Sequence, residues 1–456
     1  MVLAFYYIWY RPERWQSATF TPLEFYNSTD PKTIRRHCEE AKGAGIDGFI
    51  ISFWGIHQLG KLDSVVRVLD ECGLKYTVYI EVSRSANDLI RQIDTVLKFF
   101  GGRRNFLRIN KKPAIFIYGR VINSLSVFQM DSALKSFPGI LMFADGGGQT
   151  LNLLFENLHR YIVLDADEGF YENFCDGVFE YCAVPVFPGF KYKEKKEPYV
   201  PHENGKFYEY LLNLAIKSKA DILLITSFNE WWEGTNVEPS REFGDLFLRI
   251  TREYAEIFKK TRRKKRSREN LKLPKFNAKA CYIQNPTDFT PFLFREFMIL
   301  ESPQKIEGCD LVVYGGNERY DTAWNPYLMD YLKRGKMLIS GGPFPFYYDK
   351  DGKYVNFAHR FGLKMRVVDD NTLRGKFSAV FIDGKDTLRF YPWGEDRIRD
   401  LLEWDEDFYR LRVCKDKCED FVIGGRVGNI YYVWRGLVES KYGINALSKV
   451  LRRMGF

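Results

Sequence analysis

Short apolar and β-branched runs alternate with amphipathic stretches along the first half of the chain. The amphipathic stretches have a helical period, and the first has a helix start in Asp30 followed by Pro31. Eight apolar runs have the length and composition of buried strands: Val2–Trp9, Asp47–Trp54, Lys75–Glu81, Pro113–Gly119, Gly139–Asp145, Asp176–Tyr181, Ala183–Phe190 and Asp221–Phe228. This order predicts a (β/α)8 barrel over residues 1–257, with a doubly wound open sheet as the alternative.

The pattern changes after residue 257. The run Lys259–Arg268 carries eight positive charges and no negative charge, and we expect residues 258–274 to form a basic linker. Strand and helix patterns resume at Asp310–Gly316 and Lys336–Phe346. They predict a smaller α/β domain over 275–456, and the total of 456 residues also favours two domains.

Charge and cysteine usage narrow the functional classes. The net charge is +9, and the basic run supplies eight of these charges, so the remaining chain is nearly balanced and we expect no nucleic-acid partner. Of the eight cysteines only Cys414 and Cys418 lie close in sequence, and a lone C-x3-C lacks the second ligand pair of a zinc site. We therefore expect no metal and no cofactor, and we interpret the cysteines as reduced, buried thiols.

The sequence also suggests a cellular setting. It opens without a charged leader region and contains no run of about twenty apolar residues, so we expect a cytoplasmic protein that does not bind a membrane. Glutamine is scarce while Lys, Arg and Glu are abundant, which favours a thermophilic source.

Candidate chemistry follows the eighth predicted strand, in the stretch ITSFNEWWEGTNVEPS over 225–240. It places Glu230, Glu233 and Glu238 among large aromatic rings. A Glu-x-x-Glu pattern is usually a solvated helix face, but here it follows an apolar strand and precedes Gly234 and Pro239. Glycoside cleavage needs two carboxyl groups with separated pKa values beside flat apolar walls. We therefore predict that Glu230 and Glu233 are catalytic.

Other polar and aromatic residues end the predicted strands at the same edge of the barrel, where barrel enzymes carry their chemistry. Aromatic residues form 16% of the chain, which fits either a bulky core or a sugar-binding surface. We predict these residues as substrate-binding: Tyr7, Trp9, Tyr10, Trp54, Glu81, Tyr118, Phe190, Asn229, Trp231 and Trp232.

The stretch 225–240 resembles the motif of glycoside hydrolase family 99, the endo-α-mannosidases, and of the wider family 99-like group. The resemblance covers roughly residues 2–257. Further motifs occur in the expected order at Ala4–Tyr10, Ala44–Gly55, Val78–Glu81, Lys112–Gly119, Phe187–Phe190 and Asn204–Ile216.

The resemblance implies a retaining mechanism without a glycosyl-enzyme. Glu230 would act as the base on the 2-hydroxyl of the sugar, which attacks C1 to give a 1,2-anhydro sugar. Glu233 would protonate the leaving oxygen and then help water to open the epoxide. Trp232 stands where endo-α-mannosidases usually have His, and the segment 191–204 differs from the usual loop, so the sugar or its linkage could differ.

The second domain loosely resembles glutamine-amidotransferase-like domains, but it has no nucleophile elbow and we expect it to be non-catalytic. Any homo-oligomer would assemble through this domain. The leading hypothesis is a glycosidase acting on α-mannoside-like oligosaccharides or polysaccharides. The alternatives are a non-hydrolytic carbohydrate-binding or polysaccharide-assembly protein and, from the basic run, a nucleic-acid-binding protein.

Overall fold

The computed structural model describes residues 1–175, 180–196, 199–261, 273–315, 319–340, 348–354, 358–368, 378–390, 398–414 and 416–456. The chain divides into two compact units. The first comprises Met1–Gly146 and Leu154–Glu269, and the second comprises Gly147–Leu153 and Asn270–Phe456. Most of the basic run, from residue 262 onward, lies outside the described residues.

The first unit contains eight parallel strands in the order β7-β6-β5-β3-β2-β1-β9-β8. A parallel bridge between Leu158 and Cys182 brings the two end strands together, so the sheet curves into a nearly closed barrel. This confirms the predicted (β/α)8 class. The strands are β1 (Val2–Tyr6), β2 (Gly48–Phe53), β3 (Lys75–Ile80), β5 (Lys112–Ile117), β6 (Leu141–Asp145), β7 (Asn157–His159), β8 (Ala183–Val186) and β9 (Ile222–Ile225).

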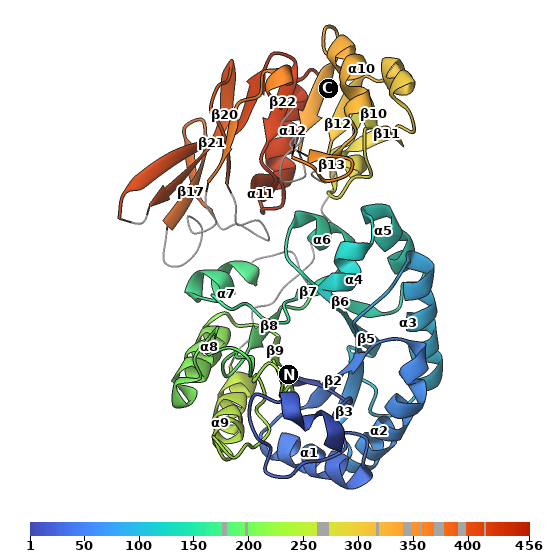
Figure 1. Cartoon of the computed structure of the whole chain (residues 1–456), viewed down its shortest axis with the longest axis vertical. Helices are drawn as coiled ribbons and strands as arrows, with labels where there is room; N and C mark the ends of the chain where they lie inside the picture. Colours follow the sequence, from blue (N-terminus) through green and yellow to red (C-terminus); the bar gives the residue numbers. More distant parts are fainter. Residues whose placement is uncertain are drawn as a thin grey trace. The chain divides into compact units, whose positions relative to one another are not determined.

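Helices surround the ring of strands (Figure 1). Their ends follow local sequence: the Asp30 side chain caps α1 by accepting a hydrogen bond from Thr33 N, and Gly73 ends α2 in the left-handed region with φ 76°. The main helices of this unit are α1 (Pro31–Gly43), α2 (Leu59–Cys72), α3 (Ala86–Phe100), α5 (Val127–Lys135), α7 (Glu168–Phe174), α8 (Lys206–Lys217) and α9 (Leu246–Lys260).

The sixth barrel strand differs from the prediction. It is β7, three residues long, and not the stretch Asp176–Tyr181, of which residues 176–179 lie outside the described residues. Asn157 and His159 are buried polar residues in this strand, so it lacks the apolar run that identified the others.

The second unit has a nine-stranded sheet in the order β11-β10-β12-β14-β22-β21-β20-β17-β18. The strands from β11 to β22 are parallel, and those from β22 to β18 pair antiparallel. The α/β prediction therefore describes only the parallel half, and the unit is mostly β. The bounds are β10 (Phe276–Tyr282), β11 (Phe294–Ile299), β12 (Leu311–Tyr314), β14 (Lys336–Ile339), β17 (Ser378–Asp383), β18 (Asp386–Arg389), β20 (Glu406–Cys414), β21 (Cys418–Val427) and β22 (Ile430–Val433).

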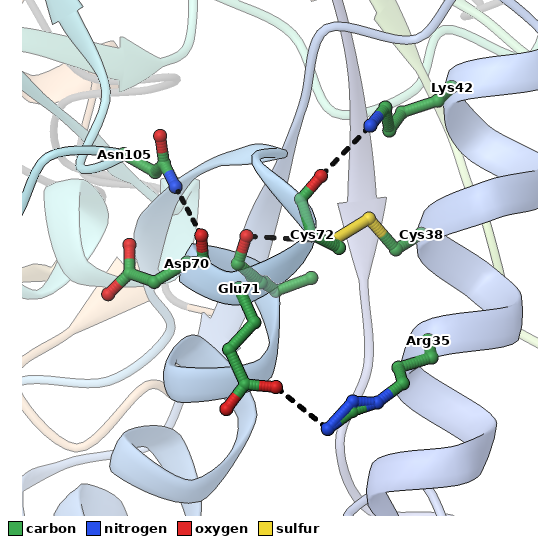
Figure 2. The surroundings of a disulfide bond; sticks show 8 residues. Arg35, Cys38, Lys42, Asp70, Glu71, Cys72 and Asn105 are labelled. Atoms are coloured by element: carbon green, nitrogen blue, oxygen red, sulfur yellow. Dashed lines mark hydrogen bonds and ion pairs between the residues drawn. A yellow bond between two sulfur atoms is a disulfide. The ribbon is translucent and has the colours of Figure 1, made fainter.

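The interpretation of the cysteines as reduced thiols is wrong. All eight are paired, as Cys38–Cys72, Cys175–Cys182, Cys281–Cys309 and Cys414–Cys418. The first bridge joins α1 to the last residue of α2, beside an ion pair of 2.7 Å between Arg35 and Glu71 (Figure 2). Sequence separations of 34 and 28 residues gave no pairing signal, because only the packing of the elements brings these cysteines together.

Candidate active site

The loop that follows β9 carries the two predicted catalytic acids. It folds back on itself, because Ser227 N donates to Thr235 O at 2.8 Å and Val237 N donates to Ser227 O at 2.9 Å. Phe228 N donates to Phe5 O at 2.8 Å, which fixes the loop to the end of β1. The loop is not helical, so Glu230 and Glu233 do not belong to a solvated helix face. They lie at the carboxyl edge of the barrel, as predicted.

Glu230 is buried and held by well-defined donors. Its Oε1 accepts hydrogen bonds from the Tyr10 hydroxyl at 2.6 Å and from Trp232 N at 3.1 Å. The same hydroxyl accepts from Trp231 N at 2.8 Å, which leaves its own proton directed at Glu230. Tyr10, predicted as substrate-binding, thus contacts the carboxylate and is itself fully buried.

Glu233 has a phenol donor of its own. The Tyr161 hydroxyl donates to Oε2 of Glu233 at 2.9 Å, and the Tyr7 hydroxyl donates to Tyr161 at 2.8 Å. Sequence reasoning missed Tyr161. It follows β7 by two positions, and the usable signal, an aromatic residue after a barrel strand, was lost because β7 itself was not recognised.

The electrostatics couple the two acids. Burial, followed by the charge of Glu233, raises the pKa of Glu230 well above its usual value, while the hydrogen bonds from Tyr10 and Trp232 act to lower it. Burial also raises the pKa of Glu233, against the hydrogen bond from Tyr161. Because the charge of one carboxyl raises the pKa of the other, the two groups titrate as a coupled pair.

Glu81, at the end of β3, supplies a further carboxyl, which is buried. It accepts a hydrogen bond of 2.8 Å from the Ser52 hydroxyl, and Ser52 in turn accepts one of 3.0 Å from the indole N–H of Trp54. Burial raises the pKa of Glu81 to about 7. Arg120 lies over the rings of Trp54 and Tyr118, at 5.4 and 5.5 Å from their centroids.

Aromatic side chains connect these carboxyls along the edge. Trp9 stacks on Trp232 with centroids 5.3 Å apart and planes at 9°, and it meets Trp54 edge-on at 6.2 Å. Tyr118 lies 6.2 Å from Tyr161, edge to face. The indole N–H of Trp232 is buried and bonds to no residue that the structure describes.

Two predicted substrate contacts belong instead to the support of the loop. Asn229 is buried, and its amide exchanges hydrogen bonds of 2.8 and 2.9 Å with the backbone of Tyr7. Trp231 was expected to wall the sugar site, but its ring is fully buried and its N–H donates to the Tyr26 hydroxyl at 3.0 Å. Phe190 is buried in the loop after β8.

Glu238 is the centre of a second buried cluster, behind Trp231. It accepts hydrogen bonds from Tyr26 at 2.6 Å, from Arg36 at 3.1 Å and from Trp231 at 3.2 Å, and it pairs with His37 at 2.8 Å. Burial opposes ionisation, yet His37 and Arg36 hold the pKa of Glu238 below its usual value.

The same cluster has the donor atoms of a metal site. Ligand atoms of His37, Glu40 and Glu238 lie within 4.8 Å of one another. Arg36, however, bonds to both Glu40 and Glu238, at 3.0 and 3.1 Å. The guanidinium already supplies the positive charge that a metal ion would bring, so this donor set fits an ion-pair network.

Paired acids, aromatic walls and a (β/α)8 barrel together define the glycoside hydrolase class of enzymes. The family model for glycosyl hydrolase family 99 matches residues 9–192 and 194–245, and the chain belongs to this family. The match ends within the first unit and lends no support to the amidotransferase-like resemblance of 275–456.

Individual relatives agree with this assignment. The chain is 24% identical over 302 residues to a glycoprotein endo-alpha-1,2-mannosidase-like protein of Homo sapiens, and 25% identical over 309 residues to a glycoprotein endo-alpha-1,2-mannosidase of Rattus norvegicus. These matches cover 54% and 55% of this chain and 66% of each relative. The solved structure of an endo-alpha-mannosidase of this family from Bacteroides thetaiotaomicron superposes with a TM-score of 0.52 at 22% identity, covering 57% of this chain and 97% of that one.

No helix in the described part of the chain combines the length and the apolar composition needed to cross a bilayer.

Proposed function

We propose that the first unit is a retaining glycosidase that cleaves α-mannoside-like glycans. Glu230 removes the proton of the sugar 2-hydroxyl, and the freed oxygen attacks C1 while the bond from C1 to the leaving oxygen breaks. Glu233 gives its proton to the leaving oxygen and afterwards takes one from the water that opens the 1,2-anhydro sugar, while Glu230 returns its proton to the 2-oxygen. Neither carboxyl has to reach C1, so three-residue spacing on one loop suffices.

One observation carries this proposal: the buried carboxyl of Glu230 and the half-buried carboxyl of Glu233 share a loop, and each has its own phenol donor. Glu230 receives two hydrogen bonds and Glu233 receives one, yet burial and the charge of Glu233 still raise the pKa of Glu230 well above its usual value. Their raised pKa values favour a state with one proton on the pair. A base and an acid are then present at the same pH.

The relatives suggest the substrate. Those matched are named for cleavage of α-1,2-linked mannosides of glycoproteins, so an α-1,2-linked manno-oligosaccharide is the first substrate to test. The free indole N–H of Trp232 can donate one hydrogen bond to a hydroxyl but cannot accept one or titrate, unlike the His usual at this position. We therefore expect a preference that differs from that of relatives carrying the His.

Kinetics of Glu230→Gln and Glu233→Gln on good and poor leaving groups test the assignment. Loss of the base should abolish turnover of every substrate. Loss of the acid should cost about 10²–10⁴-fold with a sugar leaving group and much less with fluoride, which needs little protonation. Rescue of Glu230→Gln rather than Glu233→Gln by fluoride would reverse the roles. Unchanged turnover in both variants would remove catalysis from this loop, whereas absence of turnover by the wild type would favour a non-hydrolytic carbohydrate-binding protein.

The cellular location is a separate proposal. Disulfides are typical of oxidising compartments, although intracellular proteins of hyperthermophiles also contain many. A cytoplasmic protein from a thermophile would satisfy both the disulfides and the sequence composition. Fractionation of source cells, followed by trapping of free thiols before lysis, would decide between this location and an exported form.

A further inference from the structure

The loop that follows β8 is closed at its base. Phe190 and Val200 exchange two backbone hydrogen bonds, of 2.9 and 3.1 Å, which fix the two ends of the loop between them. The described part of this loop, 191–196 and 199, contains Tyr192 and Tyr199 among several lysines. This is the segment that differs from the usual loop of the family.

The loop is attached directly to the catalytic acids. Lys191 N donates to the backbone oxygen of Glu233 at 2.9 Å. The Thr19 hydroxyl bonds to Lys191 O at 3.0 Å and to Trp232 O at 2.8 Å, which ties the two loops together. A Cβ atom on Gly234 would lie 3.2 Å from Lys191 O, a measure of how closely they pack. These contacts therefore fix the position of the loop relative to Glu233.

Three rings of this loop contact one another. Phe190 lies 5.2 Å from Tyr192 and 5.4 Å from Tyr199, and the two tyrosines lie 6.0 Å apart at 89°. Phe190 is buried, Tyr192 is half-buried and Tyr199 is 54% exposed. Neither tyrosine hydroxyl bonds to any residue that the structure describes. The three rings thus extend from the interior to the solvent, and the two tyrosine hydroxyls can bond to a ligand.

Tyr192 lies within the electrostatic influence of the catalytic pair. Burial, then the charges of Glu233 and Glu230, raises its pKa to about 12. A single exposed tyrosine would need no explanation, because apolar residues are common on protein surfaces. A fixed row of rings that begins beside the acids is instead what a sugar subsite requires: a flat apolar face with a few hydrogen-bonding groups.

We propose that Tyr192 and Tyr199 form a subsite for a hexose ring of the glycan on the leaving-group side of the scissile bond. This rests on the proposed function, since Glu233, to which the loop is bonded, is there the acid that serves the leaving sugar. The apolar face of the hexose lies against the exposed tyrosine ring, and its hydroxyls bond to the phenol oxygens. The subsite selects for glycans that extend beyond the bond being cleaved.

The test compares two substrates across Tyr192→Ala and Tyr199→Ala. One is an α-linked manno-oligosaccharide with two sugars on the leaving side, and the other is the matching glycosyl fluoride, whose leaving group has no ring. For the oligosaccharide we expect kcat/KM to fall about tenfold through KM, the effect of one lost stacking contact. The fluoride should lose much less. Tyr210→Ala, a 46% exposed tyrosine on α8, is the matched control.

Two results would overturn the subsite: equal losses on both substrates, which would mean that the rings only support Glu233, or no loss on either. Calorimetric titration of Glu233→Gln with the same oligosaccharide separates the subsite from the proposed function. If the wild type cleaves no glycoside but binds the oligosaccharide, and Tyr199→Ala weakens that binding about tenfold, the hydrolytic function fails and the subsite stands. Binding that is unchanged by Tyr199→Ala refutes the subsite.

Discussion

The hydroxyl of Tyr161 donates a hydrogen bond of 2.9 Å to Oε2 of Glu233, and it accepts one of 2.8 Å from the hydroxyl of Tyr7. The acid is therefore positioned by a chain of two phenols that starts just beyond β1. Because a hydrogen bond to the ionised form lowers a carboxyl pKa, Tyr161 counteracts part of the burial that raises the pKa of Glu233.

Tyr161→Phe should weaken catalysis by changing this balance. Without the donor, the pKa of Glu233 rises further, so the alkaline limb of the kcat/KM profile should move to higher pH. We expect kcat on a sugar leaving group to fall roughly tenfold, since hydrogen bonds to charged groups contribute about 1.5–3 kcal/mol. Tyr208→Phe, which removes a buried phenol bonded to Thr251 at 3.0 Å, is the control. An unmoved alkaline limb would contradict this role of Tyr161.

Glu81→Gln should change how stability depends on pH. The pKa of Glu81 is raised to about 7, so the folded state binds its proton more tightly than the unfolded chain does. Its stabilisation is present at low pH and is lost as pH rises toward about 7. The variant should therefore gain on the order of 3 kcal/mol relative to wild type between about pH 4 and about pH 8, by urea denaturation. If the unfolding free energies of variant and wild type changed in parallel with pH, the raised pKa would be refuted. Glu24→Gln, at an exposed position, is the control.

Glu238→Ala should destabilise the first unit strongly. Removal of the carboxylate leaves Arg36 and His37 without their buried partner, a change that typically costs about 4 kcal/mol. Since the pKa of Glu238 is lowered, the loss should be largest near neutral pH and should shrink as pH falls through that pKa. Glu256→Ala, in an exposed pair with Lys260, should cost less than about 0.5 kcal/mol in the same denaturation experiment. Equal costs would mean that the cluster contributes little.

The disulfides should contribute according to the loops they close. The double variant Cys38→Ala/Cys72→Ala opens a separation of 34 residues, worth about 4 kcal/mol in the chain-entropy model. Cys414→Ala/Cys418→Ala opens a separation of 4 residues, worth about 2 kcal/mol. Calorimetry of each variant against wild type measures the difference. Mass spectrometry after alkylation without reductant would contradict the pairing if it found eight modified thiols.

Long apolar runs in the sequence predicted most strands of the barrel, whereas the short and polar strand was missed. Long apolar runs such as Asp47–Trp54 correspond to strands, because a strand buried on both faces has to be apolar throughout. The sixth strand is short and polar, so no single-sequence pattern could mark it. Because this strand was not recognised, Tyr161, which follows it, was not predicted as a site residue.

The residues of the candidate site were likewise predicted only where the signal was local in sequence. The sequence could predict that Glu230 and Glu233 lie together on one loop, because their motif is contiguous in sequence. The actual roles of Trp231 and Asn229 depend on partners more than two hundred residues away, such as Tyr26 and Tyr7, which local patterns cannot pair. The disulfides Cys38–Cys72 and Cys281–Cys309 escaped prediction for the same reason, because each joins segments distant in the chain.

The Glu238 cluster has a practical consequence for protein engineering. The stretch 225–240 carries the two proposed catalytic acids and one half of its own scaffold, while the other half is supplied by Tyr10, Tyr26 and the first turns of α1. A loop graft onto another barrel would need these partners to be transplanted with it. Without these partners, the grafted motif would keep its sequence but lose the packing that positions its carboxylates.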